Sequence, residues 1–231
     1  SSCRFLEKLG LWPTLAPHAA PIHQVHVSHQ GHFGAVRLRR EDVHLADLGH
    51  VIPAHIIETA MQTALLDTAL TLYRPATLQA LTQQDQFTQL TIATKQATLT
   101  LRAPFVVGAD GTESTVRHLL NIPVETIDYQ QSALVTRTRL RRPHHHMAYE
   151  RFTPDGAIAM LPLVNEECAT IWSAQHATIQ QLRALSDSDF LARLQQTFGY
   201  RLGRLQAITR RHVFPLRRVR AEKPCPVASC Y

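Results

Sequence analysis

The sequence predicts an α/β fold in which a three-layer part, with helices packed on a sheet, is interleaved with an antiparallel-sheet part of α+β character. Two observations support this prediction. Phe105 to Leu120 has the pattern of a strand, a turn and a helix, and residues 132–173 contain short alternating segments separated by turn residues. With 231 residues and 45% hydrophobic content, the chain can bury a sizeable core.

The first half of the chain supplies the elements of the three-layer part. Cys3 to Leu11 has the pattern of a helix that ends at Gly10, and Pro53 to Leu70 has the strongest helical pattern, with proline in its first turn. The apolar stripe predicted for this second helix consists of Ile56, Ile57, Ala60, Met61, Ala64 and Leu65. Four short segments are expected to form antiparallel strands: Leu70 to Tyr73, Leu78 to Leu81, Leu90 to Ala93 and Ala97 to Leu101.

The antiparallel part begins with a hairpin predicted over Ile22 to Leu38. Its remaining strands are predicted at Ser132 to Leu140, Met147 to Thr153, Ile158 to Leu163, Ala169 to Ser173 and Val213 to Leu216. A helix should start at Ser186, which has capping-box spacing to Asp189, and should end at Gly199.

These elements predict two interleaved domains. Residues 1–20 and 40–125 are assigned to the first domain, and residues 21–39 and 126–216 to the antiparallel-sheet domain. Residues 217–231 are expected to return to the first domain, with a strand that begins at Val227. Crevices between such parts are common ligand sites.

Composition narrows the function classes. The net charge of +6 comes from 21 arginines and only 3 lysines, and neither an apolar run of ~18 residues nor a secretory signal is visible, so a soluble cytoplasmic protein is expected. Seven arginines lie in a segment without acidic residues, which indicates either a solvated face or an anionic partner such as a membrane surface. They are Arg201, Arg204, Arg210, Arg211, Arg217, Arg218 and Arg220. Nucleic-acid binding is not expected, because no fold motif supports it.

Histidines and cysteines do not predict a metal site. His23, His26, His29 and His32 recur every third residue, but in a strand this spacing puts successive side chains on opposite faces, so we expect them to be solvated. The tract from His144 to His146 lies beside Pro143, with no carboxylate or cysteine at ligand spacing, and the four cysteines are scattered.

The turn after the Phe105 strand is the candidate binding element. Residues 108–113 supply turn chemistry, and the first backbone N–H groups of the following helix attract oxyanions such as phosphate. Asp110 is placed to accept hydrogen bonds from ribose hydroxyls. The structural alternatives are that Asp110 caps the helix and that Arg117 forms a salt bridge.

The stretch from Val107 to Arg117, Val-Gly-Ala-Asp-Gly-Thr-Glu-Ser-Thr-Val-Arg, resembles the D-G motif of the FAD-dependent aromatic hydroxylases, the class of p-hydroxybenzoate hydroxylase. Three further segments resemble one branch of that class, the 2-octaprenyl-6-methoxyphenol hydroxylases of ubiquinone biosynthesis. They are Val25 to Gly34, Ala148 to Leu163 and Phe198 to Gly203, and in order and spacing the match covers nearly the whole chain.

This resemblance implies a flavin monooxygenase with a p-hydroxybenzoate-hydroxylase-like fold, in which an FAD/NAD(P)-binding domain is interleaved with a substrate domain. It implies FAD and NAD(P)H as cofactors, a polyprenylated phenol as substrate, and hydroxylation of its ring with O₂. By family analogy, Asp110 and Gly111 approach the FAD ribose and pyrophosphate, Gly108 and Ser114 belong to the same site, and Arg117 holds the acidic turn.

The resemblance also implies that the sheet around residues 152–163 forms the floor of the substrate cavity. Candidates for contact with the ring or tail are Phe152, Met160, Leu161, Pro162 and Trp172, although alternation allows only some of them to face the cavity. No carboxylate or histidine stands out by position as the catalytic acid or base.

Two flavin-contacting segments of the family have no counterpart in this sequence. None of the nine glycines stands in a G-x-G-x-x-G arrangement, and after Val227 the chain reads Ala-Ser-Cys-Tyr where the family has G-D-A-A-H. We therefore expect a fragment of such an enzyme, with an incomplete FAD-binding domain, that does not retain FAD in isolation. The alternative is a non-catalytic remnant or module that binds a lipid or a partner. A peripheral position on the inner face of a membrane, or in a ubiquinone-biosynthesis complex, is a further expectation.

Overall fold

The computed structural model describes residues 2–222, which divide into two compact units. The first unit combines Ser1–Thr68 with Gln130–Leu216, and the second combines Ala69–Tyr129 with the segment that starts at Arg217. These units do not follow the predicted domain boundaries, because residues 1–20 and 40–68 lie in the first unit and not with residues 69–125. The functional assignment of the two domains stays a prediction, and the strand expected at Val227 lies outside the described residues.

Most predicted helices are confirmed. The α-helices are α1 (Ser2–Lys8), α2 (Trp12–Leu15), α3 (Ala54–Leu66), α4 (Thr115–Leu119), α5 (His176–Ala184) and α6 (Asp187–Phe198), and two 3₁₀ helices are η1 (Ala16–His18) and η2 (Arg40–Val43). Helix α6 begins as predicted, since the Ser186 hydroxyl accepts a hydrogen bond from the Asp189 N–H at 3.1 Å. It ends at Gly199, whose φ of 90° is in the region that glycine adopts without strain. Among residues 2–222, no helix is both long and apolar enough to cross a membrane.

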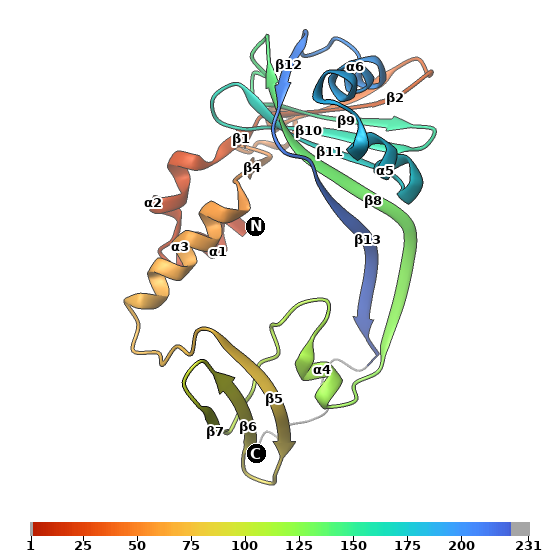
Figure 1. The fold of residues 1–231 in the computed structure, drawn as a ribbon. Helices are drawn as coiled ribbons and strands as arrows, with labels where there is room; N and C mark the ends of the chain where they lie inside the picture. Colours follow the sequence, from red (N-terminus) through yellow and green to blue (C-terminus); the bar gives the residue numbers. More distant parts are fainter. Residues whose placement is uncertain (1, 223–231) are drawn as a thin grey trace. The chain divides into compact units, whose positions relative to one another are not determined.

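Within residues 2–222, thirteen strands form three sheets (Figure 1). The two-stranded sheet pairs β1 (Ala20–Ile22) with β4 (Gly49–Val51), and the three-stranded sheet contains β5 (Ala76–Gln83), β6 (Thr88–Thr94) and β7 (Thr98–Ala103). The eight-stranded sheet contains β2 (Gln24–His29), β3 (Ala35–Arg39), β8 (Val124–Leu140), β9 (Met147–Thr153), β10 (Gly156–Pro162), β11 (Glu167–Gln175), β12 (Leu205–Ile208) and β13 (His212–Ala221).

The eight-stranded sheet has the order β12-β8-β11-β10-β9-β2-β3, with β13 paired to β8. Strands β9, β10 and β11 form an antiparallel meander, β8 pairs antiparallel with β11, and β2 runs parallel to β9. The predicted hairpin is confirmed, since β3 pairs with β2 and ends the sheet order with all five of its residues exposed. Gly156 is needed where β11 approaches the start of β10, because a Cβ atom there would lie 2.0 Å from the Ser173 carbonyl oxygen.

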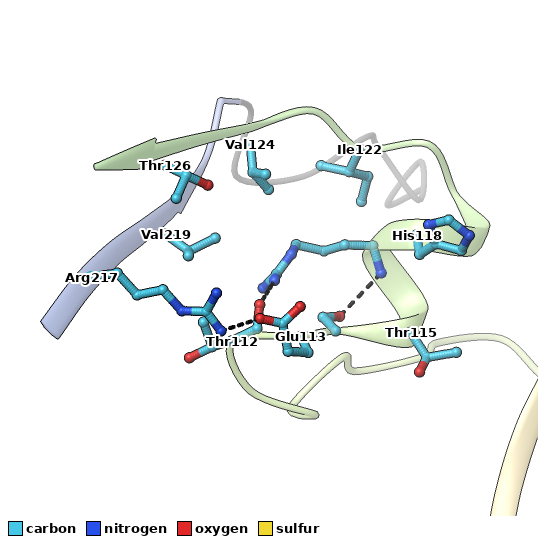
Figure 2. Close-up of a pocket in the computed structure, with 11 residues that line it drawn as sticks. Thr112, Glu113, Thr115, His118, Ile122, Val124, Thr126, Arg217 and Val219 are labelled. Carbon is cyan, nitrogen blue, oxygen red and sulfur yellow. Dashed lines mark hydrogen bonds and ion pairs between the residues drawn. The ribbon is translucent and has the colours of Figure 1, made fainter. Parts of the chain in front are cut away.

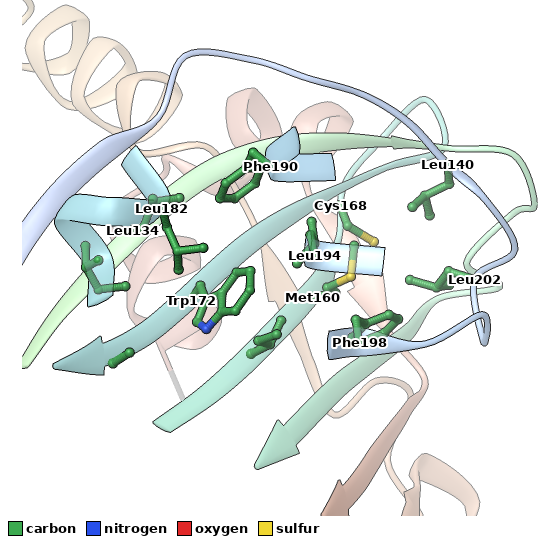
Figure 3. Packing of buried hydrophobic residues seen from close by; sticks show 13 residues of the cluster. Leu134, Leu140, Met160, Cys168, Trp172, Leu182, Phe190, Leu194, Phe198 and Leu202 are labelled. Carbon is green, nitrogen blue, oxygen red and sulfur yellow. The ribbon is translucent and has the colours of Figure 1, made fainter. Parts of the chain in front are cut away.

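The main core lies between one face of this sheet and helices α5 and α6 (Figures 1 and 3). Side chains of both helices, including Phe190, Leu194 and Phe198, pack on Leu134 and Ile158 of the sheet, and all five are almost fully buried. The Arg151 guanidinium donates a hydrogen bond to the Thr197 carbonyl oxygen at 2.9 Å at the end of α6. This arrangement leaves the opposite face of the sheet without helices α5 and α6.

A smaller core joins the N-terminal helices. It contains Leu6 of α1, Leu15 of α2 and Ala60 of α3. The predicted stripe of α3 is confirmed for Ile56, Ile57, Ala60 and Ala64, which pack in this core. It is wrong for Met61 and Leu65, which are 41% and 42% exposed, because the partner helices cover a narrower face than the sequence pattern predicts.

Two predicted strands are not formed. Leu70 to Tyr73 is irregular and exposed, and helix α3 ends at Leu66, before Leu70. Phe105 to Val107 is also irregular, with Phe105 65% and Val107 85% exposed. A strand needs a neighbour to satisfy its backbone hydrogen bonds. Within residues 2–222, neither segment pairs with another strand.

Candidate functional site

The turn around Asp110 leads into helix α4, whose first residue follows the N-cap Ser114. The Ser114 hydroxyl accepts a hydrogen bond from the Arg117 N–H at 3.1 Å and is itself buried. This is the local pattern that the sequence predicts for a helix start, and it fixes the course of the backbone from residue 110 onward.

The Asp110 carboxylate fixes the turn to the helix. Its Oδ1 atom accepts a hydrogen bond from the Ser114 hydroxyl at 2.5 Å, and its Oδ2 atom accepts one from the Val116 N–H at 3.1 Å. The Ser114 hydrogen bond is the main reason that the pKa of Asp110 lies below its ordinary value. Asp110 thus supports the helix start, as the structural alternative supposed. Because the residue is exposed and each carboxylate oxygen has two lone pairs, it can still accept hydrogen bonds from a ligand.

Arg117 holds the other side of the same turn. Its guanidinium donates one hydrogen bond to the Gly111 carbonyl oxygen at 3.1 Å and another to the Thr112 carbonyl oxygen. The contacts recorded for this guanidinium are therefore with backbone carbonyls and not with the Asp110 carboxylate. Asp110 and Arg117 together fix residues 110–117 from two directions.

Two glycines of the turn have distinct steric roles. Gly111 has a φ of 81°, and a Cβ atom there would meet nothing within 4 Å, so the backbone is accessible at this point. A Cβ atom on Gly108 would lie 3.1 Å from Cγ1 of Val116, so Gly108 allows the chain to approach α4 closely. Gly108, Asp110, Gly111, Ser114 and Arg117 therefore belong to one local arrangement.

A cavity of about 440 Å³ adjoins this arrangement in the second unit (Figure 2). Its basic side chains are Arg117, His118 and Arg217, and the Arg217 guanidinium forms an ion pair with the Glu113 carboxylate. Its other lining residues are Thr112, Ser114, Thr115, Ile122, Val124, Thr126 and Val219. The cavity combines positive charge with the hydroxyl groups that suit an anionic, polyhydroxylated ligand.

The five predicted substrate residues lie on both faces of the eight-stranded sheet. Met160, Pro162 and Trp172 are buried, and Met160 and Trp172 belong to the core beneath α5 and α6 (Figure 3). Phe152 and Leu161 point to the opposite face, which we call the open face, since alternation separates them from Met160. The open face includes Val27, Val135, Glu150, Phe152, Ala157, Ala159, Leu161, Ala169 and Ile171.

Glu150 is a candidate functional residue that the sequence analysis missed. It lies in the middle of strand β9, on the open face, and is half-buried between Val27 and Ala159 of the neighbouring strands. Burial raises the pKa of its carboxyl group above the ordinary value. In the sequence, Glu150 is a single carboxylate at a position that shares a strand face with Ala148 and Phe152. Alternation alone did not show which face of the sheet is free of helices.

The prediction of solvated histidines is wrong for His26. His26 is only 6% exposed and packs against Tyr149, with ring centroids 5.4 Å apart, and burial lowers its pKa. Its Nδ1 atom has no hydrogen-bond partner among residues 2–222. His144 is buried too and donates from Nε2 to the Leu163 carbonyl oxygen at 2.8 Å. In the described part of the chain, no three His, Cys, Asp or Glu side chains form a group that could hold a metal ion.

Part of the arginine-rich segment is used within the protein. Arg211 pairs with Asp187 at 3.0 Å, and Arg218 pairs with Glu125 at 3.3 Å. Arg204, Arg210 and Arg220 are exposed. The segment therefore combines structural ion pairs with a basic surface.

Comparison with known proteins gives a consistent result. The family model described as "FAD binding domain" matches residues 1–223. Ubiquinone hydroxylase UbiL of Rhodospirillum rubrum is 30% identical over 92% of this chain and 49% of its own length. The 3-demethoxyubiquinol 3-hydroxylase of Escherichia coli is 27% identical over 94% of this chain and 55% of its own length. The chain thus spans about half the length of these curated relatives.

Among solved structures, the flavin-dependent monooxygenase PieE, in complex with FAD and substrate, matches with a TM-score of 0.72 and 16% identity. The match covers 96% of this chain and 43% of that one. At this level of identity the likeness concerns the fold, which agrees with the α/β fold of p-hydroxybenzoate-hydroxylase type predicted from the sequence.

Proposed function

The chain belongs to the FAD-binding domain family, and from this premise we propose that it acts in an FAD-dependent monooxygenase that hydroxylates a polyprenylated phenol in ubiquinone biosynthesis. The observation that carries the proposal is the similarity, over more than nine-tenths of the chain, to a ubiquinone hydroxylase and a demethoxyubiquinol hydroxylase. The names of these relatives describe the activity of the relatives themselves, and we propose the same activity for this chain.

The residues of the Asp110 turn fit FAD. An exposed carboxylate with free lone pairs suits a ribose hydroxyl, and the accessible backbone at Gly111 allows close approach of a pyrophosphate. We assign Asp110 and Gly111 to direct contact with the cofactor. Gly108, Ser114 and Arg117 hold the turn in shape. Bound FAD, once reduced by NADH or NADPH, supplies the activation of O₂ for transfer to the ring.

The substrate side of the proposal is the open face of the sheet. Phe152 and Leu161 are its apolar contacts for the ring or tail, whereas Met160, Pro162 and Trp172 support the sheet from the covered side. The side chains of the open face exclude water from the ring and orient it. Specificity for one ring position would follow from the shape of this surface.

The cofactor assignment is tested by titrating FAD into the protein and following the quenching of flavin fluorescence. Asp110→Ala should weaken FAD binding by about tenfold, the scale of one hydrogen bond to a charged group. The matched control is Asp85→Ala in the turn between β5 and β6, which should leave FAD affinity unchanged. Equal affinity in the protein and in Asp110→Ala would contradict the assignment.

The hydroxylase assignment is tested with a short-tailed polyprenylphenol, NADH or NADPH and O₂. Excess FAD is added so that the assay does not depend on cofactor carried through purification. Mass spectrometry should detect a product that has gained one oxygen atom. Clear FAD binding with no oxygenated product from any phenol would overturn the hydroxylase proposal and leave the cofactor assignment intact.

We also propose peripheral contact with the inner face of a membrane, supported by the exposed Arg204, Arg210 and Arg220. Flotation with anionic vesicles at low salt should recover the protein in the lipid fraction. Replacing the three arginines together with glutamine should abolish this recovery, and unchanged flotation of the triple variant would contradict the proposal.

A further inference from the structure

The direct cross-strand neighbours of Glu150 on the open face are apolar. They are Val27 of β2 on one side and Ala159 of β10 on the other. Beyond Ala159, the register continues to Ile171 of β11 and Val135 of β8. A carboxylate at such a position loses part of its hydration without gaining a protein partner.

No residue of the described chain compensates for this loss. Among residues 2–222, no hydrogen bond or ion pair is recorded for the Glu150 carboxylate, and burial is the cause of its raised pKa. Other charged or titratable groups share the open face by register, and none of them is the direct cross-strand partner of Glu150. They are His29 beside Phe152 on β2, Arg137 and Arg139 on β8, and Glu167 on β11.

Small side chains flank Glu150 on the neighbouring strand β10. Ala157 and Ala159 are the cross-strand partners of Phe152 and Glu150. The Phe152 side chain is 44% exposed and lies about 7 Å further along the same face, at the two-residue repeat of a strand. An aromatic ligand can therefore pack on Phe152 while a substituent reaches the Glu150 carboxylate.

We infer that Glu150 accepts a hydrogen bond from the hydroxyl group of a phenolic ring bound on the open face. This inference rests on the proposed function and adds to it the residue that contacts the reacting hydroxyl. A lone acceptor in apolar surroundings selects a ligand with one donor and an apolar body. A carboxylate ligand would be repelled, and a sugar would leave most of its hydroxyls without partners.

Such a hydrogen bond has a direct consequence for the ring. An ionised acceptor that draws on the hydroxyl proton increases the electron density of the aromatic ring, which is the property that electrophilic oxygen transfer requires. Glu150 would thus both position the phenol and raise its reactivity. It is the carboxylate role that the sequence analysis left unassigned.

The test compares the binding of para-hexylphenol with that of its methyl ether, measured by titration calorimetry in the absence of FAD. The two probes differ in the single hydroxyl donor, so their affinity ratio reports the hydrogen bond. The protein should bind the phenol about tenfold more tightly than the ether, the scale of a hydrogen bond to a charged group. Glu150→Leu should reduce this ratio to about one, while ether affinity is kept or improved.

Two further variants separate the role of the charge from that of the fold. Glu150→Gln keeps the shape and a neutral acceptor, so its ratio should lie between those of the protein and Glu150→Leu. Glu167→Leu removes a glutamate from the margin of the same face and should keep the full ratio. Unfolding in urea should show that all variants are folded.

The outcomes are distinguishable. If Glu150→Leu keeps the tenfold preference for the phenol, or if the protein binds both probes equally, the inference about Glu150 is wrong while the proposed function stands. If neither probe binds, the open face is not a phenol site, and the proposed substrate class fails together with the inference.

Discussion

The two faces of the eight-stranded sheet are built from the same strands but differ in what covers them. On one face, Phe190, Leu194 and Phe198 of α6 pack against Ile158 and its neighbours, and these side chains are almost fully buried. On the other face, the alternate residues of the same strands are only partly buried, and a carboxylate stands among them. One face is closed by the chain itself, whereas the other can be closed by a ligand.

The difference indicates that the two faces have different roles, one in stability and the other in binding. Burial of large apolar side chains provides stability, and the covered face has nearly all of them. A partly desolvated carboxylate costs stability, and such groups are retained where binding or chemistry needs them. The comparison therefore predicts that substitutions on the covered face unfold the protein, whereas those on the open face alter binding.

The largest effect is expected at Phe190, which is 0% exposed and lies over Trp172 at a ring-centroid distance of 6.0 Å. Phe190→Ala should lower the free energy of unfolding by about 3–5 kcal/mol, because it removes a buried ring and leaves a cavity. Urea unfolding followed by tryptophan fluorescence measures the loss. The matched control is Phe33→Ala, a fully exposed phenylalanine, which should change stability little. Equal losses of unfolding free energy in the two variants would show that burial on the covered face is not the source of stability.

A smaller effect is expected at a buried pair of hydroxyls on the covered face. The Thr138 and Thr170 Oγ1 atoms are 2.7 Å apart, and both residues are 0% exposed. Thr138→Val leaves the Thr170 hydroxyl without this partner and should cost about 1–3 kcal/mol of unfolding free energy, whereas the double valine variant should recover most of this loss. Additive losses in the double variant would show that the pair is not coupled.

On the open face, Glu150 should make the free energy of unfolding depend on pH. The folded-state pKa of Glu150 is raised, so the folded protein binds the proton more tightly than the unfolded chain does. The free energy of unfolding should therefore fall as the pH rises from the ordinary glutamate pKa through the raised one. Glu150→Gln should flatten this decline in urea unfolding across the acidic range, while Glu167→Gln should keep it. An unchanged slope in Glu150→Gln would place the carboxylate in ordinary solvent.

The smallest effect is a difference in reactivity without a change in stability. Burial raises the pKa of Cys168 on the covered face to about 12, whereas Cys3 is only half-buried. A maleimide at neutral pH should label Cys3 well before Cys168, because the thiolate is the reacting form. Peptide mass spectrometry over time measures both rates. Rapid labelling of Cys168 in the folded protein would show that the covered face opens.

The sequence predicts best what is decided locally. Ser114 and Ser186 each cap a helix through a hydrogen bond to an N–H three residues later. The start at Ser186 was predicted from that spacing, and the start at Ser114 was predicted from the turn residues that precede it. The hairpin of β2 and β3 was predicted from alternation and turn residues, as were the individual strands from β8 to β11. In these segments, neighbours along the chain are sufficient to specify the structure.

The failed predictions depend on partners far away in the sequence. Phe105 to Val107 and Leu70 to Tyr73 have strand-like composition, but a strand also needs an adjacent strand for its backbone groups. Alternation placed Met160 and Leu161 on opposite faces without showing which face α5 and α6 cover. For the same reason the sequence could not single out Glu150, because its surroundings are assembled from four other strands.

The edge strand β3 has a consequence for the protein in solution. A sheet edge offers unpaired backbone groups to any other chain, and an apolar face beside it would favour association of the two chains. In β3, Arg37 and Arg39 alternate with Val36 and Leu38, and all of them are exposed. A second copy that added its own β3 edge would bring like charges together, which disfavours pairing. The two arginines thus protect the chain from fibrous aggregation while its open face stays accessible to a ligand.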